Sequence, residues 1–119
     1  MKNCVFCKIA KKMKVEIACI EPLNPVVPGH RIVFAAKHSM DFADNPDLTA
    51  KVMKRAAEIA KAKAANLMGH DGEWNLITSK GMNATQSVFH LHVHLVPRRK
   101  GDGLKLPWTG QRKSRKIRK

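Results

Sequence analysis

The stretch that decides the fold is Gln86-Ser87-Val88-Phe89-His90-Leu91-His92-Val93-His94-Leu95-Val96-Pro97-Arg98, which holds three of the six histidines in the chain. Strict alternation of apolar and polar residues over this length is typical of a half-buried strand. Successive side chains of a strand point to opposite faces, and alternate ones lie roughly 6.5–7 Å apart. We therefore expect Phe89, Leu91, Val93 and Leu95 to enter a core while His90, His92 and His94 line the other face.

Three imidazoles on one face supply a nucleophile, a proton carrier and a metal ligand near neutral pH. A histidine nitrogen can attack phosphorus to form a covalent phosphoramidate, and a second, protonated histidine can donate to the leaving group. Gln86, Ser87 and the amides of the preceding loop can donate hydrogen bonds to a phosphate and stabilise its developing charge. This chemistry needs neither a carboxylate nor magnesium. The alternative is an ordinary sheet face with solvated histidines.

Length and composition predict a single intracellular domain. The 119 residues support one domain, and a hydrophobic content of 44% excludes general disorder. No apolar run approaches the length of a membrane span, and the N-terminus has no apolar signal region, so we expect a cytoplasmic location and no membrane contact. Three cysteines, two of them in Cys4-Val5-Phe6-Cys7, do not resemble a secreted disulfide framework.

The chain is strongly basic, with 23 Lys and Arg against 9 Asp and Glu and a formal charge of +14. Such a balance attracts polyanions such as nucleic acid or nucleotides. Six of the basic residues lie in residues 111–119, which we predict to be a disordered tail after a domain at residues 1–110. The tail is suited to non-specific nucleic-acid contact, because it lacks the interleaved aromatic residues that base-specific reading would use.

The rest of the chain predicts an α+β domain, with an antiparallel sheet and one long helix on one of its faces. Asn45 followed by Pro46 is a typical start for that helix, and Gly69 is a natural stop. A short helix is expected over residues 6–13. Loops are expected over the proline-containing residues 21–30 and over residues 80–85. Further strands are expected over residues 15–20, 31–37 and 74–79.

The central motif His90-Leu91-His92-Val93-His94-Leu95-Val96 resembles that of the histidine triad (HIT) superfamily. Gln86 to Phe89 and Pro97-Arg98 flank the motif as in the family. Pro28-Gly29-His30, Lys37-His38 and the opening Cys4-x-x-Cys7-Lys8-Ile9 are similar to it as well. The chain looks most like the small Hint-like and bacterial HIT proteins. This resemblance implies an antiparallel sheet of about five strands with one long helix and short terminal helices, and a homodimer formed by sheet extension and helix packing.

The resemblance also implies an enzyme. A HIT hydrolase or transferase would cleave at the α-phosphate of a nucleotide conjugate, either a phosphoramidate or a dinucleoside polyphosphate, through a covalent nucleotidyl-histidine. By position His92 is the nucleophile, and His94 contacts phosphate and assists proton transfer. Gln86 and Ser87 resemble the pair that contacts the scissile phosphate and the leaving group.

Several positions depart from the family pattern. Ser79 stands where many members have Asn, and Thr85 where they have Gly, although Ser79 can still reach phosphate. The Asp expected to bind the ribose hydroxyls is replaced by Pro22, and the adjacent Glu21 is the proposed substitute. The segment between Cys7 and Pro25 is shorter than usual, which predicts that a strand of the N-terminal hairpin is missing or abbreviated.

A structural zinc site is the last expectation. Cys4 and Cys7 need two more ligands for a closed tetrahedral site, and the resemblance points to His38 and His90. No cofactor would be needed for catalysis.

Three alternatives stay open. The cysteines can be two ordinary thiols, the protein can be a non-catalytic nucleotide- or nucleic-acid-binding module with a structural zinc, or the His-x-His residues can hold a catalytic zinc with a metal-bound water.

Overall fold

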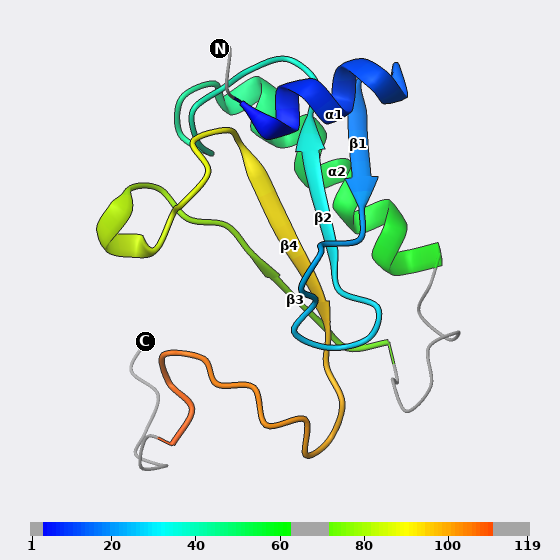
Figure 1. Cartoon of the computed structure of the whole chain (residues 1–119). Helices are drawn as coiled ribbons and strands as arrows, with labels where there is room; N and C mark the ends of the chain where they lie inside the picture. Colours follow the sequence, from blue (N-terminus) through cyan, green and yellow to red (C-terminus); the bar gives the residue numbers. More distant parts are fainter. Residues whose placement is uncertain (1–3, 63–71, 111–119) are drawn as a thin grey trace.

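The computed structural model describes residues 4–62 and 72–110 as a four-stranded antiparallel sheet between two helices (Figure 1). The elements follow in the order α1 (Val5–Met13), β1 (Ile17–Ile20), β2 (Arg31–Ala35), α2 (Pro46–Ala62), β3 (Trp74–Ile77), the 3₁₀ turn η1 (Met82–Ala84) and β4 (His92–Pro97). The strand order across the sheet is β1-β2-β4-β3. The α+β class expected from the sequence is confirmed.

Strand register decides which side chains share a face. Phe34 lies opposite His92 and Ile32 opposite His94, and partners of this kind project from the same side of a sheet. That side packs against α1, where Phe6, Ala10, Ala18, Ile32 and Phe34 form a small core. The alternate residues, among them Val33 and Val93, belong to the larger core beneath α2. The histidines of β4 therefore lie on the α1 side of the sheet.

Helix α2 begins where the sequence predicts. The Asn45 side chain accepts a hydrogen bond from the Leu48 amide at 3.2 Å, and Pro46 is the first helical residue. The buried side chains recur at helical spacing and pack on the sheet; they are Leu48, Val52, Ala56 and Ile59. The predicted stop at Gly69 lies outside the described residues.

The described sheet has four strands, so the expectation of about five is wrong by one. Helix α1 ends in Lys14, whose φ of 55° and amide bond to the Ala10 carbonyl close the helix. Strand β1 begins at Ile17, which leaves no length for a hairpin partner before it. Residues 21–30 hold three prolines and cannot supply a paired strand either. Up to Gly110 the residues after β4 form turns and extended chain, not the second short terminal helix that was expected.

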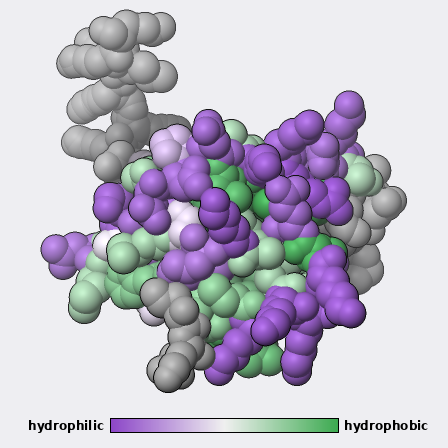
Figure 2. All heavy atoms as spheres, turned by 90° about the horizontal axis from the view of Figure 1, so that it is seen from above, coloured by the Kyte–Doolittle hydropathy of each residue, from purple (hydrophilic) through white to green (hydrophobic). Residues whose placement is uncertain are grey.

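On the face seen in Figure 2, hydrophilic side chains alternate with apolar patches. The lysines of α1 are part of this covering, since Lys8, Lys11 and Lys12 are exposed while Phe6 and Ala10 face the sheet. None of the helices in residues 4–62 and 72–110 is both long and apolar enough to cross a membrane. The basic tail predicted at residues 111–119 lies outside the described residues.

Candidate active site and metal centre

The histidine stretch does not form one continuous strand. Strand β4 starts only at His92, and residues 88–91 bend before it. Leu91, Val93 and Leu95 are buried as predicted, but the expectation that Phe89 enters the core is wrong, because this residue precedes the paired strand and is 41% exposed. The bend also separates the three histidines by environment. His90 is fully buried, whereas His92 and His94 are half-buried.

His90 belongs to a compact group of four potential metal ligands, Cys4, Cys7, His38 and His90. Their ligand atoms all lie within 4.8 Å of one another. The Nδ1 atom of His90 is 3.2 Å from Cys4 Sγ, 3.4 Å from Cys7 Sγ and 3.2 Å from His38 Nδ1. The helix start supplies the cysteines, because the Cys4 thiol caps α1 by accepting the Cys7 amide. The four residues predicted as a zinc set are thus brought together.

The donor set fits a tetrahedral cation. Bonds of about 2.0–2.3 Å to nitrogen and sulfur place the ligand atoms of such a site about 3.3–3.8 Å apart, close to the separations found here. The other ring nitrogen of His90 faces the Ala35 carbonyl at 2.6 Å, which only accepts, so the proton sits on Nε2 and the Nδ1 lone pair faces the thiols. Burial raises the pKa of the Cys7 thiol, and the neighbouring Cys4 thiol raises it further. A bound cation would lower this pKa again, because it favours the thiolate.

The tautomer of His92 is fixed by the main chain. Its Nδ1 lies 2.7 Å from the His90 carbonyl, so Nδ1 carries the proton and Nε2 keeps a lone pair. The Phe6 ring packs against this imidazole with a centroid separation of 5.0 Å. His92 therefore offers a held, neutral nitrogen suited to nucleophilic attack.

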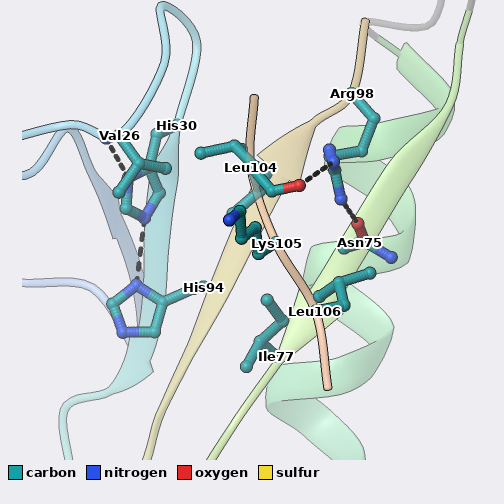
Figure 3. A pocket seen from close by; sticks show the side chains of 10 residues that line it. Val26, His30, Asn75, Ile77, His94, Arg98, Leu104, Lys105 and Leu106 are labelled. Carbon is teal, nitrogen blue, oxygen red and sulfur yellow. Dashed lines mark hydrogen bonds between the residues drawn. The ribbon is translucent and has the colours of Figure 1, made fainter. Parts of the chain in front are cut away.

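His94 stands beside His92 and is connected to His30. The two rings of β4 are 5.2 Å apart, and His94 Nδ1 is 3.0 Å from His30 Nε2. His30 Nδ1 accepts the Val26 amide at 3.1 Å, so its proton must be on Nε2, where it is donated to His94. His94 in turn carries its own proton on Nε2. His30 therefore contacts the triad directly, through His94 (Figure 3).

Burial favours the neutral form of His30, His92 and His94 by lowering the pKa of each. Burial lowers the pKa of His92, and burial followed by the neighbouring His92 and His30 lowers the pKa of His94 from 6.5 to about 4. Burial alone lowers the pKa of His30. A phosphate anion near His94 would raise that pKa again, because an opposite charge favours the protonated imidazole. The site is thus suited to take up a proton together with an anionic substrate.

The loop before β4 is tied down by Gln86. Its buried side chain accepts the Gly81 amide at 2.8 Å and donates to the carbonyls of Met40 and Val88. The side-chain amide of Gln86 thus holds the two ends of the loop together. Ser87 is exposed and Ser79 is half-buried. Roles of Gln86, Ser79 and Ser87 in substrate contact remain predictions.

Glu21, the proposed substitute for the ribose-binding Asp, is not brought to the histidines by any described contact. Its carboxylate pairs with Arg31 at 3.6 Å and its side chain is 62% exposed. Arg31 lies opposite Leu95, whose side chain packs on the α2 side of the sheet. A part in ribose binding therefore remains a prediction.

Sequence reasoning missed two supports of the site. One is Phe6, whose position between the two metal-group cysteines could have suggested its contact with His92. The other is Asp41, a buried residue whose carboxylate lies 3.3 Å from the Lys80 ammonium at the start of the loop over residues 80–85. Two backbone amides and the Lys80 ammonium lower the pKa of the Asp41 carboxyl despite its burial. No local sequence signal links two residues so far apart in the chain.

Together these features define an antiparallel α+β domain with a histidine triad at the start of an inner strand. The HIT domain family model matches residues 9–101. The protein HitA of Neisseria gonorrhoeae is 34% identical over 108 residues, covering 81% of this chain and 96% of that protein. The chain belongs to the HIT family.

Two further relatives are informative. The adenosine 5'-monophosphoramidase HNT1 of Saccharomyces cerevisiae is 32% identical, over 91% of this chain and 71% of that protein. The crystal structure of a zinc-bound histidine triad family protein from Mycobacterium smegmatis superposes with a TM-score of 0.77 at 32% identity, covering 87% of this chain and 81% of that chain.

Proposed function

We propose that the protein is a nucleotidyl hydrolase or transferase that cleaves at the α-phosphate of a nucleotide conjugate through a covalent intermediate on His92. The main observation behind this proposal is the tautomer of His92. Its Nδ1–H donates to the His90 carbonyl at 2.7 Å, so the Nε2 lone pair is free to attack. The yeast relative is an adenosine 5'-monophosphoramidase, and its activity supports the same reaction class.

The reaction proceeds in two steps. The Nε2 lone pair of His92 bonds to phosphorus as the bond to the leaving group breaks. Once phosphate has raised the pKa of His94, this ring takes up a proton on Nδ1, the hydrogen bond from His30 is released, and the Nε2 proton of His94 passes to the departing atom. Water then attacks the same phosphorus, the bond to His92 breaks, and the proton lost by water returns to His94. Nucleoside monophosphate is released. A transferase would use another acceptor hydroxyl or phosphate in place of water.

The experiment is intact-protein mass spectrometry after mixing with a panel of nucleotide conjugates, together with product release. Wild-type protein should show a nucleotidyl adduct, and His92→Ala should show neither adduct nor nucleoside monophosphate. Leu23→Ala, at a 99% exposed leucine between β1 and β2, is the control and should behave as wild type. Turnover by His92→Ala equal to wild type would overturn the proposal. Nucleotide binding with no adduct or release in the wild type would instead favour the non-catalytic binding module.

The metal in the group of Cys4, Cys7, His38 and His90 is proposed to be structural zinc. Two thiols and two imidazoles are a typical zinc donor set, and the mycobacterial relative is described as zinc-bound. The ion would tie the start of α1 to the bend before β4. Neither His92 nor His94 belongs to the group, so the alternative of a catalytic zinc on the His-x-His residues gains no support from the described residues.

We also propose that the protein is a homodimer, as the resemblance to small HIT proteins implies. A homodimer formed by sheet extension would use one of the two edge strands, β1 and β3, and we favour β3, on which Leu76 and Ile77 are 39% and 38% exposed. Sedimentation of the purified protein tests this, and Ile77→Lys should weaken such a dimer.

A cytoplasmic location and non-specific nucleic-acid contact by residues 111–119 are part of the proposal. Truncation after Gly110 should reduce both nucleic-acid affinity and its salt dependence.

A further inference from the structure

The segment over residues 38–41 lies beside the chain that leads into β4 and binds it at successive positions (Figure 1). The Ser39 carbonyl accepts the Leu91 amide at 2.6 Å, directly before β4. The Met40 carbonyl accepts the side-chain amide of Gln86 at 2.8 Å. The segment begins at one of the two histidines of the metal group. It therefore connects the metal group, the histidine strand and the loop in front of that strand.

The loop over residues 80–86 is closed by its own hydrogen bonds. The Gln86 amide donates to the Gly81 carbonyl at 3.1 Å, and the Gln86 side chain accepts the Gly81 amide at 2.8 Å. Within the loop, Thr85 has a φ of 70° in the left-handed region. A non-glycine residue keeps such a backbone conformation only where its surroundings fix it. The loop therefore needs attachments to the rest of the protein.

Among residues 4–62 and 72–110, two side-chain contacts join this loop to the segment over residues 38–41. One is the hydrogen bond from Gln86 to Met40. The other is the ion pair between Lys80 and Asp41, with 3.3 Å between Nζ and Oδ2. A unit held at one point can still turn about it, whereas a second point fixes its orientation. The ion pair is therefore needed, beside the Gln86 bond, to fix how the loop is turned.

The two oxygens of the Asp41 carboxylate have separate partners. Oδ1 accepts the backbone amides of Ala43 and Asp44, at 2.9 and 3.1 Å, and these bonds fix the side chain within its own turn. Oδ2 faces the Lys80 ammonium. The side chain of Asp41 is 5% exposed and that of Lys80 is 57% exposed. Asp41 is thus the fixed partner of the pair, and Lys80 is the partner that it holds.

We infer that Asp41 is a positioning residue for this loop and acts through Lys80. The pair sets where the loop amides and Ser87 meet the phosphate of a substrate, so the inference rests on the proposed function. A misplacement of about 1 Å can cost on the order of 100-fold in rate. An ion pair with an exposed lysine contributes little to stability, because water screens it. Loss of the pair should therefore slow the reaction far more than it destabilises the protein.

The test compares Asp41→Asn, which keeps an Oδ1 atom for the two amides but loses the charge opposite Lys80, with Lys80→Met. Each variant should lower kcat/KM for adenosine 5'-monophosphoramidate on the order of 10-fold, and Lys80→Met should leave the urea midpoint close to wild type. Lys80→Arg keeps the cation and should recover most of the rate. The double variant should be no slower than either single one, because residues that act as a pair are not additive. Lys54→Met, at an exposed lysine of α2, is the matched control.

Hydrogen exchange provides a measurement that does not depend on turnover. The amides of Gly81, Thr85 and Gln86 are hydrogen-bonded within the loop. They should exchange faster in Asp41→Asn and in Lys80→Met, because a loop that is no longer fixed opens more often. The amides of β4 should exchange as in the wild type.

Three results would overturn the inference. Lys80→Met could slow the reaction while Asp41→Asn does not, which would mean that Lys80 binds the substrate directly. The double variant could lose the product of the two single effects, which would mean that the residues act separately. The loop amides could exchange at wild-type rates in both single variants. A wild-type protein without adduct or turnover would count against the proposed function alone, because hydrogen exchange would still show whether the pair holds the loop.

Discussion

The Nδ1 proton of His92 is donated to the main-chain carbonyl of His90, with 2.7 Å between nitrogen and oxygen. The side chain of His90 meanwhile lies 3.2 Å from Cys4 Sγ and 2.6 Å from the Ala35 carbonyl. One residue thus joins the proposed metal centre to the proposed nucleophile. Since Phe6 lies between the two cysteines and packs on the His92 ring, the start of α1 contributes a second connection. The metal group is therefore placed to support the geometry of attack without touching substrate.

Removal of the metal should destabilise the protein. An ion that binds only the folded state at 1,000 times its Kd contributes about 4 kcal/mol to the free energy of unfolding. We expect one zinc per chain by elemental analysis, and a loss of that order in urea unfolding after chelation or in Cys4→Ser. Cys19→Ser is the matched control, because Cys19 lies in β1 outside the group. Equal zinc content in the two serine variants would contradict the assignment.

His30 should act as a positioning residue for His94. Replacement by Phe removes the Nε2–H that His94 Nδ1 accepts at 3.0 Å. Misplacement of a catalytic group by about 1 Å can cost on the order of 100-fold in rate, and we expect kcat to fall by up to about that factor with a smaller change in KM.

The control for this variant is His30→Gln, whose amide can still donate to His94 and should recover part of the rate. A uniform loss of activity and stability in both variants would instead indicate that His30 only fills space near Val26.

The sequence was sufficient for the parts of the fold that local patterns determine. Asn45-Pro46 predicts the start of α2, and the alternation of Leu91, Val93 and Leu95 predicts their burial. It was not sufficient for Phe89, because alternation continues through the bend and does not show where hydrogen-bonded pairing begins. The tautomers were likewise out of reach, since they depend on carbonyls and amides that only the folded backbone places.

Acid should destabilise the protein through His94. Burial and the neighbouring histidines lower its pKa from 6.5 to about 4, so the unfolded chain binds more protons than the folded one between these values. The contribution of His94 to stability is complete above pH 6.5 and is lost as the pH falls toward 4. After a discount for partial exposure this amounts to on the order of 1–2 kcal/mol.

The measurement is the difference between wild-type and His94→Asn protein in urea unfolding from pH 7 to pH 4.5. The metal ligands are unchanged in the variant, so the difference isolates His94. The variant should show a shallower fall of stability with acid. Parallel curves would mean that the His94 pKa is the same in the folded and unfolded states.

Thr85 should be a site of stored backbone strain. Its φ of 70° and ψ of 23° lie in the left-handed region, which costs a β-branched residue on the order of 1–2 kcal/mol. Thr85→Gly should relieve this strain and, after the entropy cost of glycine, raise the free energy of unfolding by about 0.5–1 kcal/mol. Thr85→Ala keeps a Cβ atom in the same conformation and should gain less. Urea unfolding of the zinc-loaded variants measures the difference.

If Thr85→Ala stabilised the protein as much as Thr85→Gly, the threonine side chain rather than the left-handed backbone would be the cause. If neither changed stability, the loop would carry no strain to release.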